Sequence, residues 1–267
     1  MSEFEQLLNQ YKSLNIILSK QDIEQVKVEY VYHSNRLEGS NLTLIQTVDV
    51  IKYHKAKGEV SLEDMIMAVD HYRALNAAIS FGANKYPLSE RILLSLHETL
   101  LKNTFQIDPA YKSWIENGQE LGQFKVKSNR IKTTIRGSEE LFVTPEPNQS
   151  KEMIVGSLSV YQQSNEPFLV KLSKLVQNIY NAHAFFDGNK RMTRLIIANQ
   201  LTVNSYPLLI PHAHQNDYNE ALIRGFMSGT HTDILYVIER SFNQQLSAEI
   251  ESYNNAKKPN RGFGLIF

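Results

Sequence analysis

The chain has 267 residues, 42% of them hydrophobic, and its 28 basic and 28 acidic side chains give a formal net charge of zero. This composition is typical of a folded globular protein, and the charge balance excludes broad binding to nucleic acid or to an anionic membrane. The chain contains no cysteine, which excludes disulfides, Cys-ligated zinc, iron–sulfur clusters and thiol nucleophiles.

The first residues, Met1–Gln6, are polar and acidic and do not resemble a secretory signal. The sequence also lacks an uninterrupted apolar run of about 18 residues, the length that a membrane-spanning helix needs. We therefore expect a cytoplasmic protein without a membrane partner.

Most of the chain is predicted to be helical, because apolar side chains recur at intervals of three and four residues. Thr43 and Ser61 precede two of these segments and are predicted N-caps. The predicted helices cover residues 3–18, 22–34, 44–53, 61–81, 87–100, 169–182, 191–203, 217–227 and 233–253. The expected fold class is all-α, a helical bundle.

Residues 122–147 lose the helical period. Gln123–Lys127 and Arg130–Ile135 each alternate apolar and polar side chains, and Ser128-Asn129 and Gly137-Ser138 are typical turn residues. This pattern predicts a small β-hairpin on the helical body.

Common phosphate and metal motifs do not explain the chain. Neither a P-loop nor a Gly-rich dinucleotide loop after a strand is present. His212 and His214 could suggest a metal site, but no third ligand follows at a convincing spacing, so a surface loop is favoured.

One segment gathers groups of complementary chemistry, the sequence HAFFDGNKRMTR from His183 to Arg194. A helix should end near His183 and the next begin near Lys190, so that backbone N–H groups at its start form an anion site. Arg191 and Arg194 share one helix face and could converge on a polyphosphate. Asp187 could hold Mg²⁺, and His183 is suited to act as a general base near neutral pH.

This segment resembles the signature of the Fic family, H-x-F-x-[DE]-G-N-x-[KR]-x-x-R, with Phe185 at the buried aromatic position. The resemblance implies a Fic-type helical bundle with a hairpin flap, and transfer of AMP from ATP to a Ser, Thr or Tyr hydroxyl of a target protein. Lys190 stands where the commonest form has glycine, a variant shared with the phosphotransferase branch of the fold. A phosphotransferase, another nucleotidyl transferase or a silent nucleotide-binding module therefore remains an alternative.

The resemblance also implies a role for each residue of the motif. His183 would deprotonate the acceptor hydroxyl, and Asp187 would bind Mg²⁺ at the α- and β-phosphates of ATP. The remaining motif residues would hold the phosphates: Gly188, Asn189 and the backbone of Lys190 at the α-phosphate, Arg191 at the β-phosphate and Arg194 at the γ-phosphate.

A second motif lies far upstream, from Ser34 to Gly39. By itself it is a helix end, because glycine is favoured directly after a helix. It also resembles the Fic inhibitory motif [ST]-x-x-x-E-[GN], in the N-terminal arrangement called class II. The resemblance implies that Glu38 pairs with Arg194 and so prevents productive binding of ATP. In some relatives the same acid helps to remove AMP from the modified target.

The family resemblance gives the hairpin and a late segment candidate roles. The flap would bind the target backbone by strand addition, through residues Val126, Lys127, Ile131, Thr133 and Ile135. A plain surface hairpin is the alternative. Tyr218 resembles the family tyrosine beside the adenine base, although a core tyrosine is nearly as well supported.

The resemblance divides the chain into three parts. Residues 1–84 would form N-terminal helices with the inhibitory motif, residues 85–245 the catalytic core, and residues 246–267 a helix end and tail. The chain leaves no room for the winged helix of many relatives, so we expect a protein substrate of unknown identity and no direct nucleic-acid binding. The apolar end Gly264–Phe267 could pack on its own core or in a homo-oligomer.

Overall fold

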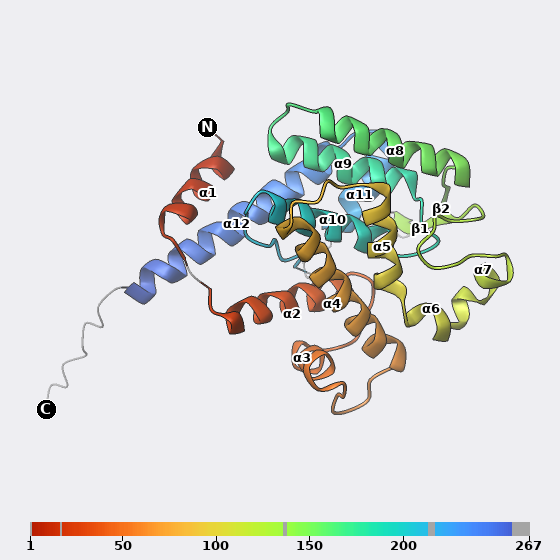
Figure 1. Cartoon of the computed structure of the whole chain (residues 1–267), viewed down its shortest axis with the longest axis horizontal. Coiled ribbons are helices and arrows are strands. Elements are labelled where there is room, and N and C mark those ends of the chain that lie inside the picture. The colour runs from red at the N-terminus through yellow and green to blue at the C-terminus, as the bar shows by residue number, and fades with distance from the viewer. Residues whose placement is uncertain (1, 17, 136–137, 213–216, 258–267) are drawn as a thin grey trace, which may run out of the picture.

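The computed structural model describes residues 2–16, 18–135, 138–212 and 217–257, without the side chains of residues 134, 135, 138, 256 and 257. The described chain is mostly helical, with one small antiparallel sheet (Figure 1). The all-α fold with a small hairpin is confirmed. The elements in chain order are α1 (Glu3–Ser13), α2 (Lys20–Arg36), α3 (Leu44–Tyr53), α4 (Leu62–Ala83), α5 (Glu90–Leu101), α6 (Thr104–Ile107), the 3₁₀ turn η1 (Pro109–Tyr111), α7 (Lys112–Glu116), β1 (Arg130–Ile135), β2 (Ser138–Val143), α8 (Pro147–Gln163), α9 (Phe168–Ala182), α10 (Asn189–Val203), α11 (Asp217–Ser228) and α12 (Thr232–Lys257).

The helix boundaries differ from the prediction at the N-terminus. Helix α1 ends at Ser13, five residues before the predicted end at Leu18, because Asn15 adopts a left-handed conformation with φ 47°. Helix α2 begins at Lys20, where Ser19 and Asp22 form a reciprocal capping box. Helix α8 is absent from the predicted helices. Its apolar stripe is weak, because Val155 and Val160 face solvent.

The hairpin lies later in the chain than predicted. Arg130 pairs with Val143 and Ile131 with Phe142, so β1 pairs with β2 and the turn falls near residues 136–137. The predicted first strand, residues 123–127, is outside the hairpin, because its polar groups bond elsewhere: Lys125 N donates to Ala184 O at 2.8 Å. The alternation of apolar and polar residues there does not follow burial, because Lys125 is 2% exposed whereas Val126 is 40% exposed.

Helix α10 runs through the centre of the molecule and separates two hydrophobic clusters (Figure 1). Leu195 and Ile196 face the first cluster, which includes side chains of α4, α5 and α9. Ile197 and Leu201 face the second, which includes side chains of α9, α11 and α12. Since α10 is buried on all sides, close packing around the helix restricts the movement of the residues at its first turn.

The N-terminal helices pack on the rest of the chain at two places (Figure 1). Helix α1 lies along α12, where the rings of Phe4 and Phe242 are 5.2 Å apart. Helix α2 packs on α4, which in turn packs on α10. The end of α2 is thereby brought to the first turns of α10. Within the described ranges, every helix is too short or too polar to cross a membrane.

The contact between α4 and α10 requires a glycine. A Cβ atom at Gly82 would lie 2.6 Å from the carbonyl oxygen of Asn199 and 2.8 Å from Thr202 Cβ. We expect Gly82→Ala to lower the free energy of unfolding by about 1–3 kcal/mol, because the backbones must separate. Gly156, exposed in the middle of α8 with open space around it, is the matched control. Gly156→Ala should stabilise by about 0.5–1 kcal/mol in the same urea titration. Equal effects at both positions would contradict this packing argument.

Candidate active site

The predicted catalytic residues lie where α9 ends and α10 begins. His183 closes α9 in the left-handed conformation with φ 42°, and Gly188 precedes α10 with φ 75°. A Cβ atom at Gly188 would also lie 3.3 Å from Leu100 Cδ2. Glycine is therefore needed for the sharp turn into α10. The helix begins at Asn189, slightly earlier than predicted, and no side chain caps its start. The first N–H groups of a helix lack intrahelical partners, so this start can serve as an anion site.

Asn189 holds this loop from the inside. Its Oδ1 accepts a hydrogen bond from Phe185 N at 3.1 Å, and its Nδ2 donates to Phe185 O at 2.8 Å. The same Nδ2 lies 3.3 Å from His183 Nδ1. With its side chain used in this way, Asn189 shapes the loop and orients the imidazole. A phosphate contact would come from the backbone N–H groups at the start of α10.

A buried histidine, His97 of α5, supports the loop from below. Its ring stacks on Phe185 with centroids 4.2 Å apart, and its Nε2 lies 3.1 Å from the carbonyl oxygen of Asp187. Burial lowers the pKa of His97 to about 4, so the ring is neutral at neutral pH and its Nε2–H can donate to that carbonyl. The sequence offered no sign of this role beyond an isolated His-Glu pair.

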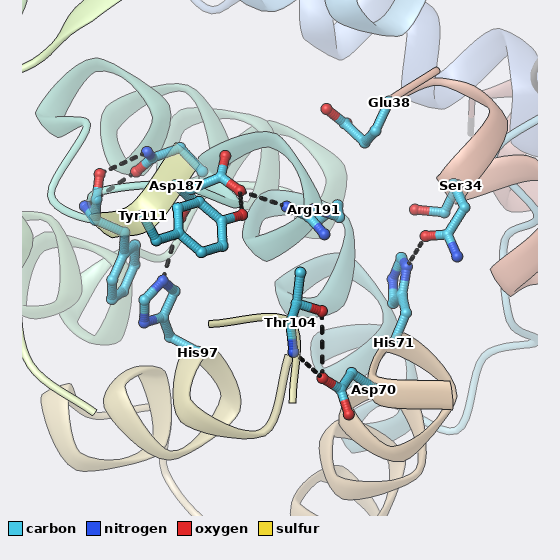
Figure 2. Close-up of polar contacts among 12 residues, drawn as sticks. Ser34, Glu38, Asp70, His71, His97, Thr104, Tyr111, Asp187 and Arg191 are labelled. Atoms are coloured by element: carbon cyan, nitrogen blue, oxygen red, sulfur yellow. Dashed lines mark hydrogen bonds and ion pairs between the residues drawn. The ribbon is translucent and has the colours of Figure 1, made fainter. Parts of the chain in front are cut away.

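Asp187 is held by two donors on one oxygen. Tyr111 donates its hydroxyl to Asp187 Oδ2 at 2.5 Å, and Arg191 contacts the same atom at 2.8 Å. Figure 2 shows both bonds, with Glu38 and Ser34 on the other side of Arg191. Burial opposes the charge of Asp187, but Arg191 and Tyr111 outweigh it and keep the pKa of this carboxyl below its ordinary value.

The surroundings of Asp187 fit a magnesium ion that arrives with its substrate. The side chain is 41% exposed, and among the described residues no cluster of three or more His, Asp or Glu could hold a metal unaided. Mg²⁺ commonly takes one or two carboxylates and completes its octahedral shell with water and substrate phosphates. A single ionised carboxylate beside an anion site meets that requirement.

Arg194 is buried and fully engaged by the N-terminal part of the chain. Glu38 Oε1 lies 2.5 Å from Arg194 NH2, so the predicted contact between these residues is present. Arg194 Nε donates to Ser34 Oγ at 2.7 Å, and its NH2 donates to the backbone carbonyl of Ser34 at 3.1 Å. Arg194 is 2% exposed. Its Nε and NH2 groups therefore bond to Ser34 and Glu38 in this structure.

The electrostatics of this pair favour the ionised form of Glu38. Burial raises the pKa of Glu38, but the charges of Arg194, Arg191 and Lys190 together bring it below its ordinary value. Because the two charges satisfy one another in a partly dry site, removing either one leaves the other uncompensated.

Further side chains hold the end of α2 in this position. Asn219 of α11 accepts from Arg194 NH1 at 3.4 Å and donates to the carbonyl oxygen of Leu37 at 3.0 Å. Nδ1 of His71 in α4 lies 2.6 Å from Asn35 Oδ1. A dashed line at His71 marks this contact in Figure 2. Gly39 then leaves the helix with φ 93°, as predicted for a residue directly after a helix. The motif is thus tied to α4, α10 and α11.

Tyr218 lies beneath Arg194. Its ring centroid is 5.7 Å from the guanidinium carbon, and its hydroxyl donates to Thr193 Oγ1 at 2.9 Å. It is 8% exposed and belongs to the second hydrophobic cluster. This position agrees with the core tyrosine, the alternative that the sequence left open.

A cleft of about 210 Å³ opens above the loop. His183 and Asp187 line it, together with Glu38, Lys190 and Tyr180. The sequence predicted a pKa near neutrality for His183, but burial and then the charge of Lys125 lower it to about 3. The imidazole is therefore neutral and able to accept a proton at neutral pH, although it is a weaker base than expected.

The hairpin borders the same cleft through β1. Arg130, Ile131 and Lys132 line it, and Ile131 is also anchored in the second hydrophobic cluster. Thr133 and Ile135 follow in the same strand, the side chain of Ile135 being outside the described part. The two other predicted flap residues, Val126 and Lys127, are not in the hairpin; Lys127 Nζ donates to Ser113 Oγ at 2.9 Å.

Sequence reasoning missed several residues that complete the site: Tyr111, His97, His71, Asn219 and Lys125. They lie far from the motifs in sequence and reach them only through tertiary contacts. Asn219 alone had a local signal, because it follows the predicted Tyr218. Of the predicted pair His212 and His214, the second lies outside the described residues, and the ring of His212 packs against His33 with centroids 4.8 Å apart.

The fold is that of Fic domain proteins of known structure. A Fic domain containing signaling protein from Bacteroides thetaiotaomicron superposes with a TM-score of 0.78 at 23% identity, covering 95% of this chain and 97% of that one. A Fic family protein from Desulfovibrio desulfuricans gives a TM-score of 0.75 at 19% identity, covering 97% of this chain and 74% of that one.

Residues 87–201 match the model of the Fic/DOC family, and this range includes His183 and the first turns of α10. It is 27% identical over 217 residues to the protein adenylyltransferase Fic of Drosophila grimshawi, covering 74% of this chain and 39% of that protein. The enzyme of the same name from Aedes aegypti is 23% identical over 234 residues, covering 82% and 42% respectively. The chain thus spans about two fifths of the length of these curated relatives.

Proposed function

We propose that the protein is an adenylyltransferase that transfers AMP from ATP to a Ser, Thr or Tyr hydroxyl of a target protein, and that Glu38 keeps it inactive. The observation that carries this proposal is the engagement of Arg194 by Glu38 and Ser34 beside a complete loop–helix anion site. The naming of the curated relatives as protein adenylyltransferases supports the reaction class.

Binding of ATP would use groups that already converge on the loop. The N–H groups at the first turn of α10, from Gly188 to Lys190, would receive the α-phosphate, and Arg191 would face the β-phosphate. Asp187 would hold Mg²⁺, which when bound would neutralise phosphate charge and orient the α- and β-phosphates. Arg191 already pairs with Asp187 in this structure. The guanidinium and the carboxylate would therefore be in position before ATP and Mg²⁺ bind.

The chemical step requires a proton acceptor at the target hydroxyl. The neutral ring of His183 would take the hydroxyl proton as the oxygen bonds to the α-phosphorus of ATP. The bond from that phosphorus to the bridging oxygen breaks, and pyrophosphate leaves. The negative charge of bound ATP would raise the pKa of His183 from about 3, which makes the imidazole a better base in the complex.

The proposed inhibition follows from competition for one guanidinium. Each of the three guanidinium nitrogens of Arg194 donates to Ser34, Glu38 or Asn219 in this structure. The γ-phosphate of ATP needs the same donors, and the carboxylate of Glu38 would repel it at close range. ATP could then bind only with its phosphates misplaced, so the fold itself would suppress transfer.

The target is proposed to dock along β1, the strand that borders the cleft. Strand addition uses backbone groups, so it places a hydroxyl near His183 without demanding one particular sequence. The partner is therefore a protein substrate whose identity the chain does not encode. A homo-oligomer and removal of AMP from the target stay predictions, and we retain the cytoplasm as the proposed location.

Parallel labelling tests the reaction type. The Glu38→Gly protein is incubated with Mg²⁺ and either α-³²P-ATP or γ-³²P-ATP, and self-modification is read on a denaturing gel. We expect label from the α position only, with a mass increase of one AMP in intact-mass spectra. Label from the γ position only would replace this proposal with the phosphotransferase, the alternative that Lys190 supports. ATP binding by calorimetry without any label would indicate a silent binding module.

A further inference from the structure

A buried lysine lies between the hairpin and the catalytic loop. Lys125 is 2% exposed, and burial lowers the pKa of its ammonium to about 8. Lysine is almost never buried to this extent unless its ammonium has specific partners, because taking the charge out of water is costly. The contacts of Lys125 therefore indicate why it is there.

The ammonium joins the two ends of the hairpin. Lys125 Nζ donates to Asn129 Oδ1 at 3.0 Å and to Thr144 Oγ1 at 2.9 Å. Asn129 directly precedes β1, and Thr144 directly follows β2. Thr144 N also donates to the carbonyl oxygen of Asn129 at 3.4 Å. Thr144 Oγ1 also donates to the carbonyl oxygen of Asn129 at 2.9 Å. The ammonium thus adds a charged donor to a base that Asn129 and Thr144 also close directly, and hydrogen bonds from a charged donor are stronger than neutral ones.

Two of these residues, Lys125 and Asn129, also connect the hairpin to the catalytic loop. Lys125 N donates to the carbonyl oxygen of Ala184 at 2.8 Å, and Asn129 Nδ2 donates to that of Phe185 at 3.0 Å. Ala184 and Phe185 follow His183 directly. The carbonyl of Phe185 is also the one that Asn189 holds, so the base of the hairpin and the start of α10 share one acceptor.

We propose that Lys125 is a positioning residue that fixes the target-docking hairpin against the loop that carries His183. Its ammonium sets the distance between β1 and the loop without touching substrate. The consequence for catalysis rests on the proposed adenylyl transfer, whereas the mechanical link between hairpin and loop stands without it. Loss of the ammonium leaves Asn129 and Thr144 without their charged donor and frees the hairpin to move.

Hydrogen exchange tests the mechanical link directly, in the full-length protein without ATP. Lys125→Met keeps the length and apolar stem of the side chain and removes the charge. We expect amide exchange in residues 130–135 and 138–143 to become about ten-fold faster, because those amides depend on the closed base. Lys171→Met, which removes a partly buried ammonium over the ring of Tyr161, should leave this region unchanged. Unchanged protection in Lys125→Met would overturn the proposal.

A second readout separates positioning from general damage. In the Glu38→Gly background, Lys125→Met should lower self-modification about ten-fold and leave ATP affinity by calorimetry within about two-fold. Lys125→Arg, which retains the charge and donors, should restore both protection and transfer. Restored protection without restored transfer would overturn the positioning role.

Thr144→Val keeps the shape of the side chain and removes the hydroxyl that accepts from Lys125 Nζ and donates to Asn129, so the base of the hairpin is tested without replacing Lys125. It should also loosen residues 130–135 and 138–143, and normal protection there would count against the proposal. If Glu38→Gly transfers no AMP at all, the proposed function fails. The exchange data then still decide whether Lys125 holds the hairpin.

Discussion

Glu38→Gly is expected to raise AMP transfer by on the order of 100-fold over the wild-type chain. The physical reason is the release of Arg194, whose NH2 is held 2.5 Å from Glu38 Oε1 in this structure. Without the carboxylate, the guanidinium can bind the γ-phosphate of ATP, and the α-phosphate can reach the loop in a productive orientation. The measurement is the initial rate of self-modification with α-³²P-ATP and Mg²⁺.

Two further variants make this expectation specific. Glu38→Gln retains the shape and one hydrogen bond to Arg194 but loses the charge. Its rate of self-modification should therefore fall between those of the wild-type chain and Glu38→Gly. Glu29→Ala removes an acid of α2, the helix that precedes Glu38, at a position outside the site, and it should behave as wild type. Equal rates for wild type and Glu38→Gly would remove the inhibition from the proposed function.

His183→Ala is expected to abolish transfer in the Glu38→Gly background, with a loss of about 100-fold or more. His183 lines the cleft, and it is the neutral imidazole that the proposed step needs as proton acceptor. ATP affinity should change little, because the phosphate groups are held by α10 and Arg191. The measurement pairs the initial rate of labelling with calorimetric titration of ATP.

Because His183 is left-handed, an alanine there is strained, and a folding defect must be separated from a chemical one. His183→Asn is the matched variant, since asparagine tolerates that conformation and cannot act as a base at neutral pH. Both variants should be inactive, and His183→Asn should keep the thermal stability of the parent protein. Residual transfer within about ten-fold of the parent would assign the base to another group.

Predictions from sequence were most successful where the determining contacts are local. The helical period located most of the helices, and Gly188 and Gly39 were read as turn and helix-end residues because only glycine adopts their backbone conformation without strain. The pairing of Glu38 with Arg194 could be predicted only through the resemblance to a known motif. No rule of spacing joins residues 156 positions apart.

Predictions failed where tertiary contacts outweighed a local pattern. The alternation over residues 123–127 is real, but Lys125 gives its backbone N–H to Ala184 and its ammonium to the base of the hairpin. The strand that pairs with β1 is therefore β2. In the same way the intrinsic pKa of a histidine suggested a base poised near neutrality, whereas burial and a neighbouring ammonium make His183 far less basic.

The balanced charge of the chain excluded a broad polyanion surface, and the sequence by itself determined the helical class and the residue types of a local phosphate site. Only the tertiary structure decided the state of that site. Packing of α2 on α4, and of α4 on α10, carries Glu38 to Arg194, and the short helices after α5 carry Tyr111 to Asp187. Composition and the spacing of apolar residues predict a helical fold because burying apolar surface stabilises it. The pairing of single charges depends instead on the distances between charged side chains, which are set only when the helices pack.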